Sequence, residues 1–164
     1  MVQRLILLIC DEVMSGFRVA WGGAQSVYGL DPDISTFGKV IGGGLPLAAI
    51  AGKTEIMDQL APQGPVYQAG TLAGNPLAVS VGIKVLEILA EQKEKNYQKL
   101  SHLSSNLIKG LKEISLELDI PMQTSALGGM LGYFFCNKPV RDHESAKATN
   151  SKLFKKFLFP HLVV

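Results

Sequence analysis

The chain has 164 residues, of which 47% are hydrophobic and 18% charged, and its formal net charge is +2. This length suffices for a domain with its own hydrophobic core, and the small net charge argues against a dedicated nucleic-acid surface. The longest apolar runs are too short to cross a bilayer, so no membrane partner is expected. No leader peptide is recognisable, which predicts a cytoplasmic protein, or one of the plastid stroma if the source is a plant or alga.

The N-terminal part is predicted to contain short strands separated by glycine-rich loops. Residues 5–10 form a continuous apolar run that ends at Asp11-Glu12, a pattern typical of a parallel strand covered on both faces. Further strands are predicted over residues 34–37 and 47–51.

Two helices are predicted to follow. The first is short, spans residues 53–60 and has Thr54 as its cap. The second begins at Asn75-Pro76 and runs to about residue 91, because Asn caps helices well and Pro is tolerated at the first helical position.

The C-terminal part is predicted to contain a long helix, a strand or hairpin and a final helix. The long helix covers residues 95–118 and carries one apolar stripe. Residues 127–136 form either a strand or a hairpin with a break at Gly128-Gly129, and the final helix runs over residues 146–159 until Pro160 stops it. The stripe consists of Leu100, Leu103, Leu107, Leu111, Ile114 and Leu118.

Alternation of strands and helices indicates the α/β class. The composition changes near residue 95 from glycine-rich to lysine-rich and helical. We therefore expect one part over residues 1–94 and a second over residues 95–164.

Two residues of the first part are candidates for chemistry. Asp11 lies at the carboxyl end of a predicted parallel strand, where open α/β sheets bind ligands, although a helix cap or a satisfied buried carboxylate fits that position equally well. Lys39 stands between Gly38 and the run 42–44, where glycine permits close approach to a bound group; a solvated surface lysine is the usual alternative. The run is not a nucleotide-binding loop, because Val40 stands where Ser or Thr would follow the lysine.

Two segments, DEVMSGFR (residues 11–18) and GKVIGGG (residues 38–44), resemble the core of the class III aminotransferase family, pyridoxal-phosphate (PLP) enzymes of fold type I. The resemblance is most specific over residues 5–89. It implies that residues 1–94 are part of the large PLP-binding domain, with a parallel-type sheet and helices. Residues 95–164 would then be a linking helix and the start of a small C-terminal α/β domain.

The family pattern implies roles for five residues. Lys39 would form the Schiff base with the cofactor aldehyde and move protons on the substrate carbon. Asp11 would pair with the pyridine nitrogen and keep it protonated, and Val13 would pack against one face of the ring. Gly70 and Thr71 would bind the phosphate across the interface from the partner subunit of a homodimer. The position of Thr71, shortly before a predicted helix, agrees with the preference of anions for helix N-terminal regions.

Within the family, three stretches resemble the aminomutases that act on glutamate-1-semialdehyde: residues 17–25 (FRVAWGGAQ), 46–52 and 67–76 (YQAGTLAGNP). Met14 stands where ordinary class III transaminases usually carry Gln. This resemblance implies a small-molecule substrate, conversion of glutamate-1-semialdehyde to 5-aminolevulinate in tetrapyrrole biosynthesis, and a cofactor that passes through pyridoxamine phosphate. An ω-transaminase is one alternative, and a non-catalytic truncated product or interaction module is another.

The chain is much shorter than the members of this family. Parts of the shell around Lys39 and Asp11 are therefore expected to lie outside it, and little activity is expected from the chain alone. Glu12 is expected to face solvent, with tuning of Asp11 as the alternative. Arg18 and Trp21 lie near the site by resemblance, although structural packing is at least as good an explanation.

The remaining polar candidates indicate no metal or redox centre. His102, His143 and His161 have no spacing suited to a metal ion. Cys10 and Cys136 are isolated, so neither a zinc site nor a disulfide is predicted, and both are expected to be buried free thiols.

Overall fold

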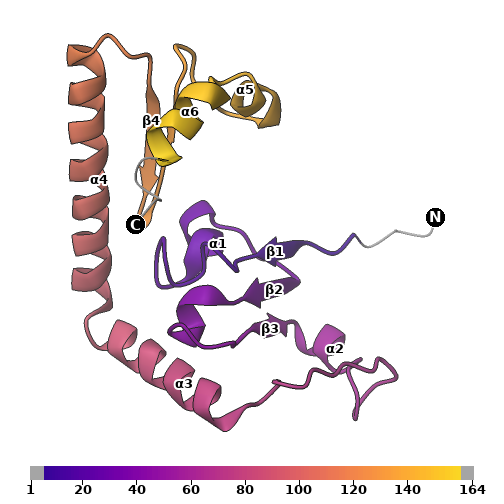
Figure 1. Cartoon of the computed structure of the whole chain (residues 1–164). Helices are drawn as coiled ribbons and strands as arrows, with labels where there is room; N and C mark the ends of the chain where they lie inside the picture. Colours follow the sequence, from indigo (N-terminus) through magenta and orange to yellow (C-terminus); the bar gives the residue numbers. More distant parts are fainter. Residues whose placement is uncertain (1–5, 160–164) are drawn as a thin grey trace. The chain divides into compact units, whose positions relative to one another are not determined.

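Residues 6–159 are described by the computed structural model of the chain, which divides into two compact units (Figure 1). The first unit ends at Tyr97 and the second begins at Gln98. This division falls within the long helix α4 (Lys93–Glu117), as does the boundary expected after residue 94. The roles assigned to the two parts stay predictions.

A three-stranded sheet forms the centre of the first unit, in the order β1 (Ile9–Asp11), β2 (Ile34–Phe37) and β3 (Ala49–Gly52). β1 and β2 run parallel with Asp11 opposite Thr36, whereas β3 is antiparallel to β2. The strand predicted over residues 34–37 is confirmed, and the strand predicted over residues 47–51 begins and ends slightly later. The sheet is therefore mixed, with its parallel pairing between β1 and β2.

The long buried strand predicted over residues 5–10 is not found. Within the described chain the strand begins only at Ile9, which is itself 59% exposed. The side chains before it are also exposed, with Ile6 at 90%. Leu5 lies outside the described residues. The reason is that β1 is an edge strand whose neighbour among residues 6–159 is β2. An apolar run forms a buried strand only when other elements cover its two faces.

Two short helical segments connect the strands, namely α1 (Gly23–Tyr28) and the 3₁₀ turn η1 (Lys39–Gly42), and a third, α2 (Thr54–Met57), follows β3. The prediction for α2 is wrong in detail. Lys53 occupies the cap position, no side chain caps the helix, and Thr54 is its first residue. The helix also ends before Leu60.

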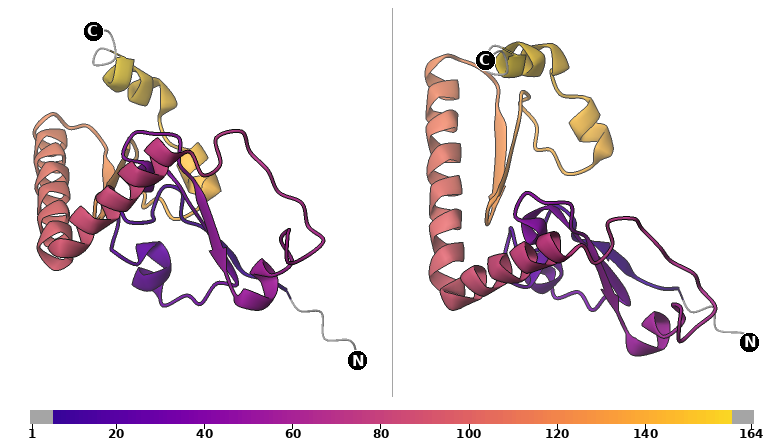
Figure 2. Two further views of the ribbon diagram at one scale, coloured as in Figure 1. Left: turned by 90° about the horizontal axis from the view of Figure 1, so that it is seen from below. Right: turned by 60° about the horizontal axis from the view of Figure 1, so that its bottom comes forward.

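Helix α3 (Pro76–Glu91) confirms the prediction of a strong helix capped by Asn75, whose Oδ1 accepts a hydrogen bond from the Ala78 N–H at 3.1 Å. Figure 2 shows α3 alongside η1. Gly82 permits this packing, because a Cβ there would lie 2.9 Å from the Ile41 carbonyl oxygen. Ile41 and Ala78 are buried at this contact and form part of the core of the first unit.

The second unit contains most of α4, a hairpin and two short helices, namely β4 (Gln123–Leu127), β5 (Met130–Phe134), α5 (His143–Lys147) and α6 (Ser151–Leu158). Of the two predicted alternatives the hairpin is found, with its turn at Gly128-Gly129, but it begins at Gln123 rather than residue 127 and ends at Phe134. The single helix predicted over residues 146–159 is wrong, because Asn150 caps a separate α6 through a bond from the Leu153 N–H. Pro160, expected to end that helix, lies outside the described residues.

Within the second unit α6 lies beside the hairpin (Figure 1), and aromatic side chains join the two. Tyr133 of β5 stacks on Phe154 with ring centroids 5.6 Å apart, and Phe157 meets Phe135 edge to face at 5.8 Å. The apolar stripe predicted on α4 is left largely open, since Leu103 is 53% exposed. No helix within residues 6–159 combines the length and hydropathy that a bilayer span requires.

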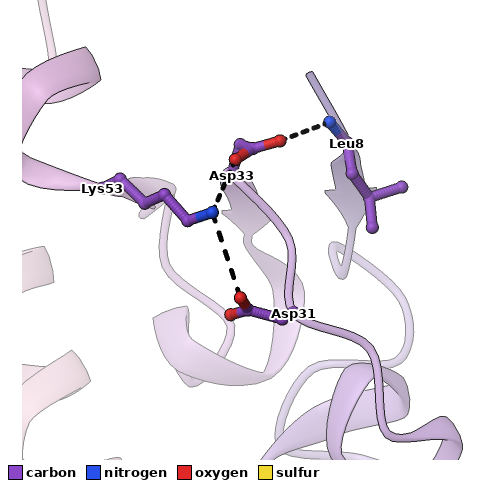
Figure 3. Close-up of polar contacts among 4 residues, drawn as sticks. All are labelled: Leu8, Asp31, Asp33 and Lys53. Atoms are coloured by element: carbon purple, nitrogen blue, oxygen red, sulfur yellow. Dashed lines mark hydrogen bonds and ion pairs between the residues drawn. The ribbon is translucent and has the colours of Figure 1, made fainter. Parts of the chain in front are cut away.

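Asp33 ties the three strands together at the end of the sheet away from Asp11 (Figure 3). Its carboxylate accepts hydrogen bonds from the Leu8 N–H and from Lys53 Nζ, each at 2.7 Å, and Asp31 lies 3.9 Å from the same ammonium. The bond from Lys53, followed by that from Leu8, holds the pKa of Asp33 below its ordinary value. Asp33 therefore connects the chain before β1, the start of β2 and the residue after β3.

We predict that Asp33→Asn lowers the melting temperature at pH 7. The folded state lowers the pKa of Asp33, so its stabilising effect is complete above the ordinary value of about 3.9 and disappears as the pH falls through the folded-state value. The difference from the unaltered chain, measured by circular dichroism melts, should shrink over that range. Asp31→Asn is the matched control, because Asp31 is 94% exposed and should change the melting temperature far less. Equal effects of the two substitutions would contradict this account.

Candidate functional site

Asp11 is fixed at the carboxyl end of β1. Its Oδ1 accepts hydrogen bonds from the Val13 N–H at 3.0 Å and from the Thr36 hydroxyl at 3.2 Å. Since Thr36 is also the partner of Asp11 in the parallel register, the two bonds hold the carboxylate at the carboxyl edge of the sheet. This is the edge at which open α/β sheets bind ligands.

Lys39 lies at the same edge of the sheet, just after the end of β2, the strand that pairs with β1. It follows Thr36 by three residues and is the first residue of η1. Its φ of 49° is in the left-handed region, which costs a residue with a Cβ about 1–2 kcal/mol. Its side chain is exposed. A non-glycine residue held in this conformation points to a functional constraint.

Val13 completes this group. A Cβ placed on Gly38 would lie 3.4 Å from Val13 Cγ1, so the Val13 side chain lies beside the backbone that leads into Lys39. The structure thus brings Asp11, Val13 and Lys39 to one edge of the sheet. The chemical roles of the three residues stay predictions.

Gly70 and Thr71 occupy a different loop, ahead of α3. Both are exposed, and the Gly70 carbonyl accepts a bond from the Ala73 N–H at 2.9 Å within the same turn. Gly70 also lines a shallow hollow together with Pro46 and Leu47. The two residues predicted to bind phosphate therefore lie in a loop of the first unit that is stabilised by its own contacts. Their role in binding phosphate stays a prediction.

Glu12 is buried, and the expectation that it faces solvent is wrong. Its side chain is 1% exposed, and its carboxylate accepts three hydrogen bonds: from the Ser15 hydroxyl at 2.5 Å, the Ala24 N–H at 3.0 Å and the Gln25 N–H at 2.6 Å. The donors come from the loop after β1 and from the first turn of α1. Buried carboxylates are stable when such donors satisfy them.

The environment of Glu12 keeps it ionised. Burial raises the pKa of Glu12, but the hydrogen bonds from Ser15, Gln25 and Ala24 outweigh burial and leave the pKa below its ordinary value. Gly23 makes room for the charge, because a Cβ there would lie 2.7 Å from both carboxylate oxygens. Sequence reasoning missed the burial of Glu12. The available signal was the pair Gly22-Gly23 in this loop, of which Gly23 lies against the carboxylate.

The loop between Glu12 and α1 is packed through its aromatic residues. Phe17 meets Trp21 edge to face at 5.3 Å and Phe37 of β2 at 5.7 Å. The Phe17 carbonyl also accepts a hydrogen bond from the Tyr97 hydroxyl at 2.9 Å, and burial raises the pKa of Tyr97. Trp21 is therefore a packing residue in this structure, and Arg18 is exposed beside it.

The histidine and cysteine residues form no metal or disulfide site within the described residues. Across residues 6–159 no cluster of His, Cys, Asp and Glu is suited to a metal ion. His102 lies within 3.0 Å of the Asn106 amide on α4, His143 begins α5, and His161 lies outside the described residues. Cys10 and Cys136 are free thiols, but both are half-buried rather than fully buried.

Comparison with known proteins identifies the class of protein to which this chain belongs. Residues 2–157 match the model of the family described as aminotransferase class III. The chain therefore belongs to the class III aminotransferases. The cofactor of this family is PLP, and its members act on small molecules.

Solved structures agree with the family and confirm the predicted α/β class. An ω-transaminase from Sphaerobacter thermophilus is 33% identical, with a TM-score of 0.74 over 82% of this chain and 30% of that one. A transaminase with PLP bound is 29% identical, with a TM-score of 0.71 over 78% of this chain and 30% of that one. A glutamate-1-semialdehyde aminomutase from Pseudomonas aeruginosa, in complex with PMP, is 23% identical, with a TM-score of 0.74 over 92% and 35% of the two chains. This last likeness establishes the fold, and the chain spans about a third of the length of each of these structures.

We predict that Gly23→Ala destabilises the chain by about 2–4 kcal/mol, the sum of a strained left-handed residue and a displaced buried carboxylate. Gly29→Ala is the matched control. Gly29 has a similar φ, 63° against 70°, but a Cβ there meets no atom within 4 Å, so only the backbone cost of about 1 kcal/mol applies. Urea unfolding measures both. Losses of the same size would show that Gly23 is required only for its backbone conformation.

Proposed function

We propose that this chain carries the core of a PLP site in which Lys39 binds the cofactor covalently and Asp11 binds its ring nitrogen. One observation supports the proposal above all others. The parallel register of β1 and β2 puts an amine-bearing residue and a carboxylate at the same edge of one sheet. The residues present fit the family cofactor, because an aldehyde requires an amine and a pyridine nitrogen requires an acid.

Each residue has a distinct task in this proposal. Lys39 would hold the cofactor through its amine and, once freed from it by the substrate amine, would take a proton from the substrate carbon and return it. Asp11 holds a proton on the ring nitrogen, and Val13 offers apolar surface to one ring face. Bound PLP supplies the electron sink that makes the substrate proton removable. Thr36 keeps Asp11 in position through its hydroxyl bond.

The phosphate of the cofactor is assigned to Gly70 and Thr71 of a second copy of the chain. Both residues are exposed, and they precede α3, a helix of 16 residues whose N-terminal end favours anions. In this proposal the complete site requires a homodimer.

The specific activity that we propose is conversion of glutamate-1-semialdehyde to 5-aminolevulinate. Its support is in the sequence, namely Met14 and the stretches over residues 17–25, 46–52 and 67–76. The aminomutase structure from Pseudomonas aeruginosa is compatible with this assignment through its fold. The reaction moves an amino group within one molecule, so the amine that leaves the substrate must be retained at the site.

An ω-transaminase is the second candidate. The observation in its favour is the 33% identity with the Sphaerobacter thermophilus enzyme, against 23% for the aminomutase. The third candidate is a chain that keeps the fold but has no catalytic activity. Its support is that the chain covers only 30–35% of the solved structures it matches.

We predict that the purified chain mixed with PLP develops an absorbance band near the edge of the visible range. Borohydride should abolish the band and leave the cofactor mass on the peptide that contains Lys39. Lys39→Ala should abolish both signals because it removes the amine to which this proposal attaches the cofactor. Lys84→Ala is the matched control, since Lys84 is a surface lysine of α3 that pairs only with exposed Glu87, and it should keep both signals. Labelling spread evenly over surface lysines would refute the assignment.

We further predict that the chain alone converts glutamate-1-semialdehyde far more slowly than a typical enzyme, for which kcat is about 10 per second. The reason is that it spans about a third of its structural relatives. Production of 5-aminolevulinate without a second amino donor favours the aminomutase, whereas turnover that requires an ω-amine favours the transaminase. A normal enzymatic rate from the isolated chain would contradict the expected loss.

A further inference from the structure

We propose that Glu12 is a positioning residue of this site, which holds the turn that directs Asp11 and Val13 toward Lys39. The inference rests on the proposed function for the identity of the site, but its structural basis is independent. Glu12 is the largest fully buried side chain among the described residues, and the proposed chemistry makes no direct use of it.

The first step in the argument is a closed series of contacts. Glu12 Oε1 accepts from the Gln25 N–H, and the Gln25 side-chain oxygen accepts from the Ser35 hydroxyl at 2.7 Å. Ser35 is followed by Thr36, which donates to Asp11, and Asp11 is bonded covalently to Glu12. The circuit therefore starts and ends at the same turn, and it includes β2, the strand that leads to Lys39.

The second step concerns the backbone of the turn. The Glu12 N–H donates to the Thr36 carbonyl at 2.9 Å, and the Glu12 carbonyl accepts from the Gly16 N–H at 2.7 Å. Main chain and side chain of Glu12 are thus both fixed. As a result the backbone between Asp11 and Val13 is held at Glu12 by its N–H, its carbonyl and its side chain. The bond from the Val13 N–H to Asp11 Oδ1 depends on this arrangement.

The third step is the residue type. Three donors converge on Glu12, and a carboxylate is the side chain that accepts from all of them and donates to none. Glutamine has the same shape, but its amide nitrogen would face a backbone N–H. Burying a charge costs free energy. The buried Glu12 carboxylate beside Asp11 is therefore explained if it fixes the conformation of the turn after β1, which an apolar side chain could not fix.

The fourth step is the loop held by the same carboxylate. Ser15 precedes the segment over residues 17–25 that favours the aminomutase, and Ala24 and Gln25 are its last two residues. This segment contains Trp21, the single tryptophan of the chain. Glu12 therefore couples the residue assigned to the ring nitrogen with the loop that distinguishes the proposed activity from its relatives. Displacement of one should disturb the other.

The test uses amide hydrogen exchange of the full chain without cofactor. Glu12→Gln should raise the exchange rate of the Val13 N–H about tenfold, the change expected for loss of one charge-assisted hydrogen bond. The Val79 N–H of α3, which donates to Asn75 at 2.9 Å, serves as the internal reference and should change little. Ser15→Ala should act in the same direction but less strongly. Glu87→Gln, at an exposed acid of α3, is the matched control and should leave Val13 unchanged.

Each outcome decides the proposal. Selective loss of Val13 protection supports a positioning role. An equal rise at Val13 and Val79 would show that Glu12 only stabilises the fold, and unchanged Val13 protection would overturn the inference. Should Glu12→Gln fail to fold, Ser15→Ala decides by the same comparison.

A second measurement separates this inference from the proposed function. Binding of PLP is compared with binding of an analogue that has carbon in place of the ring nitrogen, followed through Trp21 fluorescence. Glu12→Gln should weaken PLP binding about tenfold and binding of the analogue much less, because the analogue keeps the ring face beside Val13 but lacks the nitrogen assigned to Asp11. Equal weakening of both ligands would contradict action through Asp11. If the unaltered chain binds neither ligand, the proposed function fails, and the exchange of Val13 alone decides the role of Glu12.

Discussion

The burial of the Glu12 carboxylate is the constraint on which the candidate site depends. One ionised side chain satisfies donors from the loop after β1 and from the start of α1, and its backbone is paired with β2. A charge in this place is tolerated only while all its partners are present. The glycine at position 23 and the short helix that follows are therefore consequences of the same requirement, and the path of the chain from β1 to β2 has little freedom.

The site residues gain their proximity from the parallel pairing of β1 and β2. Residues that follow adjacent parallel strands meet at one edge, so an acid and an amine distant in sequence become neighbours without any direct bond between them. Asp33 and Lys53 stabilise the opposite end of the same sheet. The candidate site and the Asp33–Lys53 contact thus lie at opposite ends of three short strands.

Features encoded locally were the ones that sequence analysis predicted well. The strand over residues 34–37, the Asn75 cap and the turn at Gly128-Gly129 depend on a few adjacent residues. The family motif predicted that Asp11 and Lys39 belong to one site; the structure places both at one edge of the sheet, and their roles stay predictions. Features that depend on distant partners were not predictable: the exposure of the run before Ile9 follows from what covers it. The burial of Glu12 follows from donors at residues 15, 24 and 25, and no local pattern reports them.

The left-handed backbone of Lys39 has a consequence for how this position tolerates change. Glycine adopts that conformation freely, so a chain with glycine at position 39 would gain roughly 1 kcal/mol in folding free energy over one with any ordinary side chain. The backbone at position 39 thus suits glycine better than lysine, so the amine proposed to bind the cofactor stands where a side chain lowers folding stability.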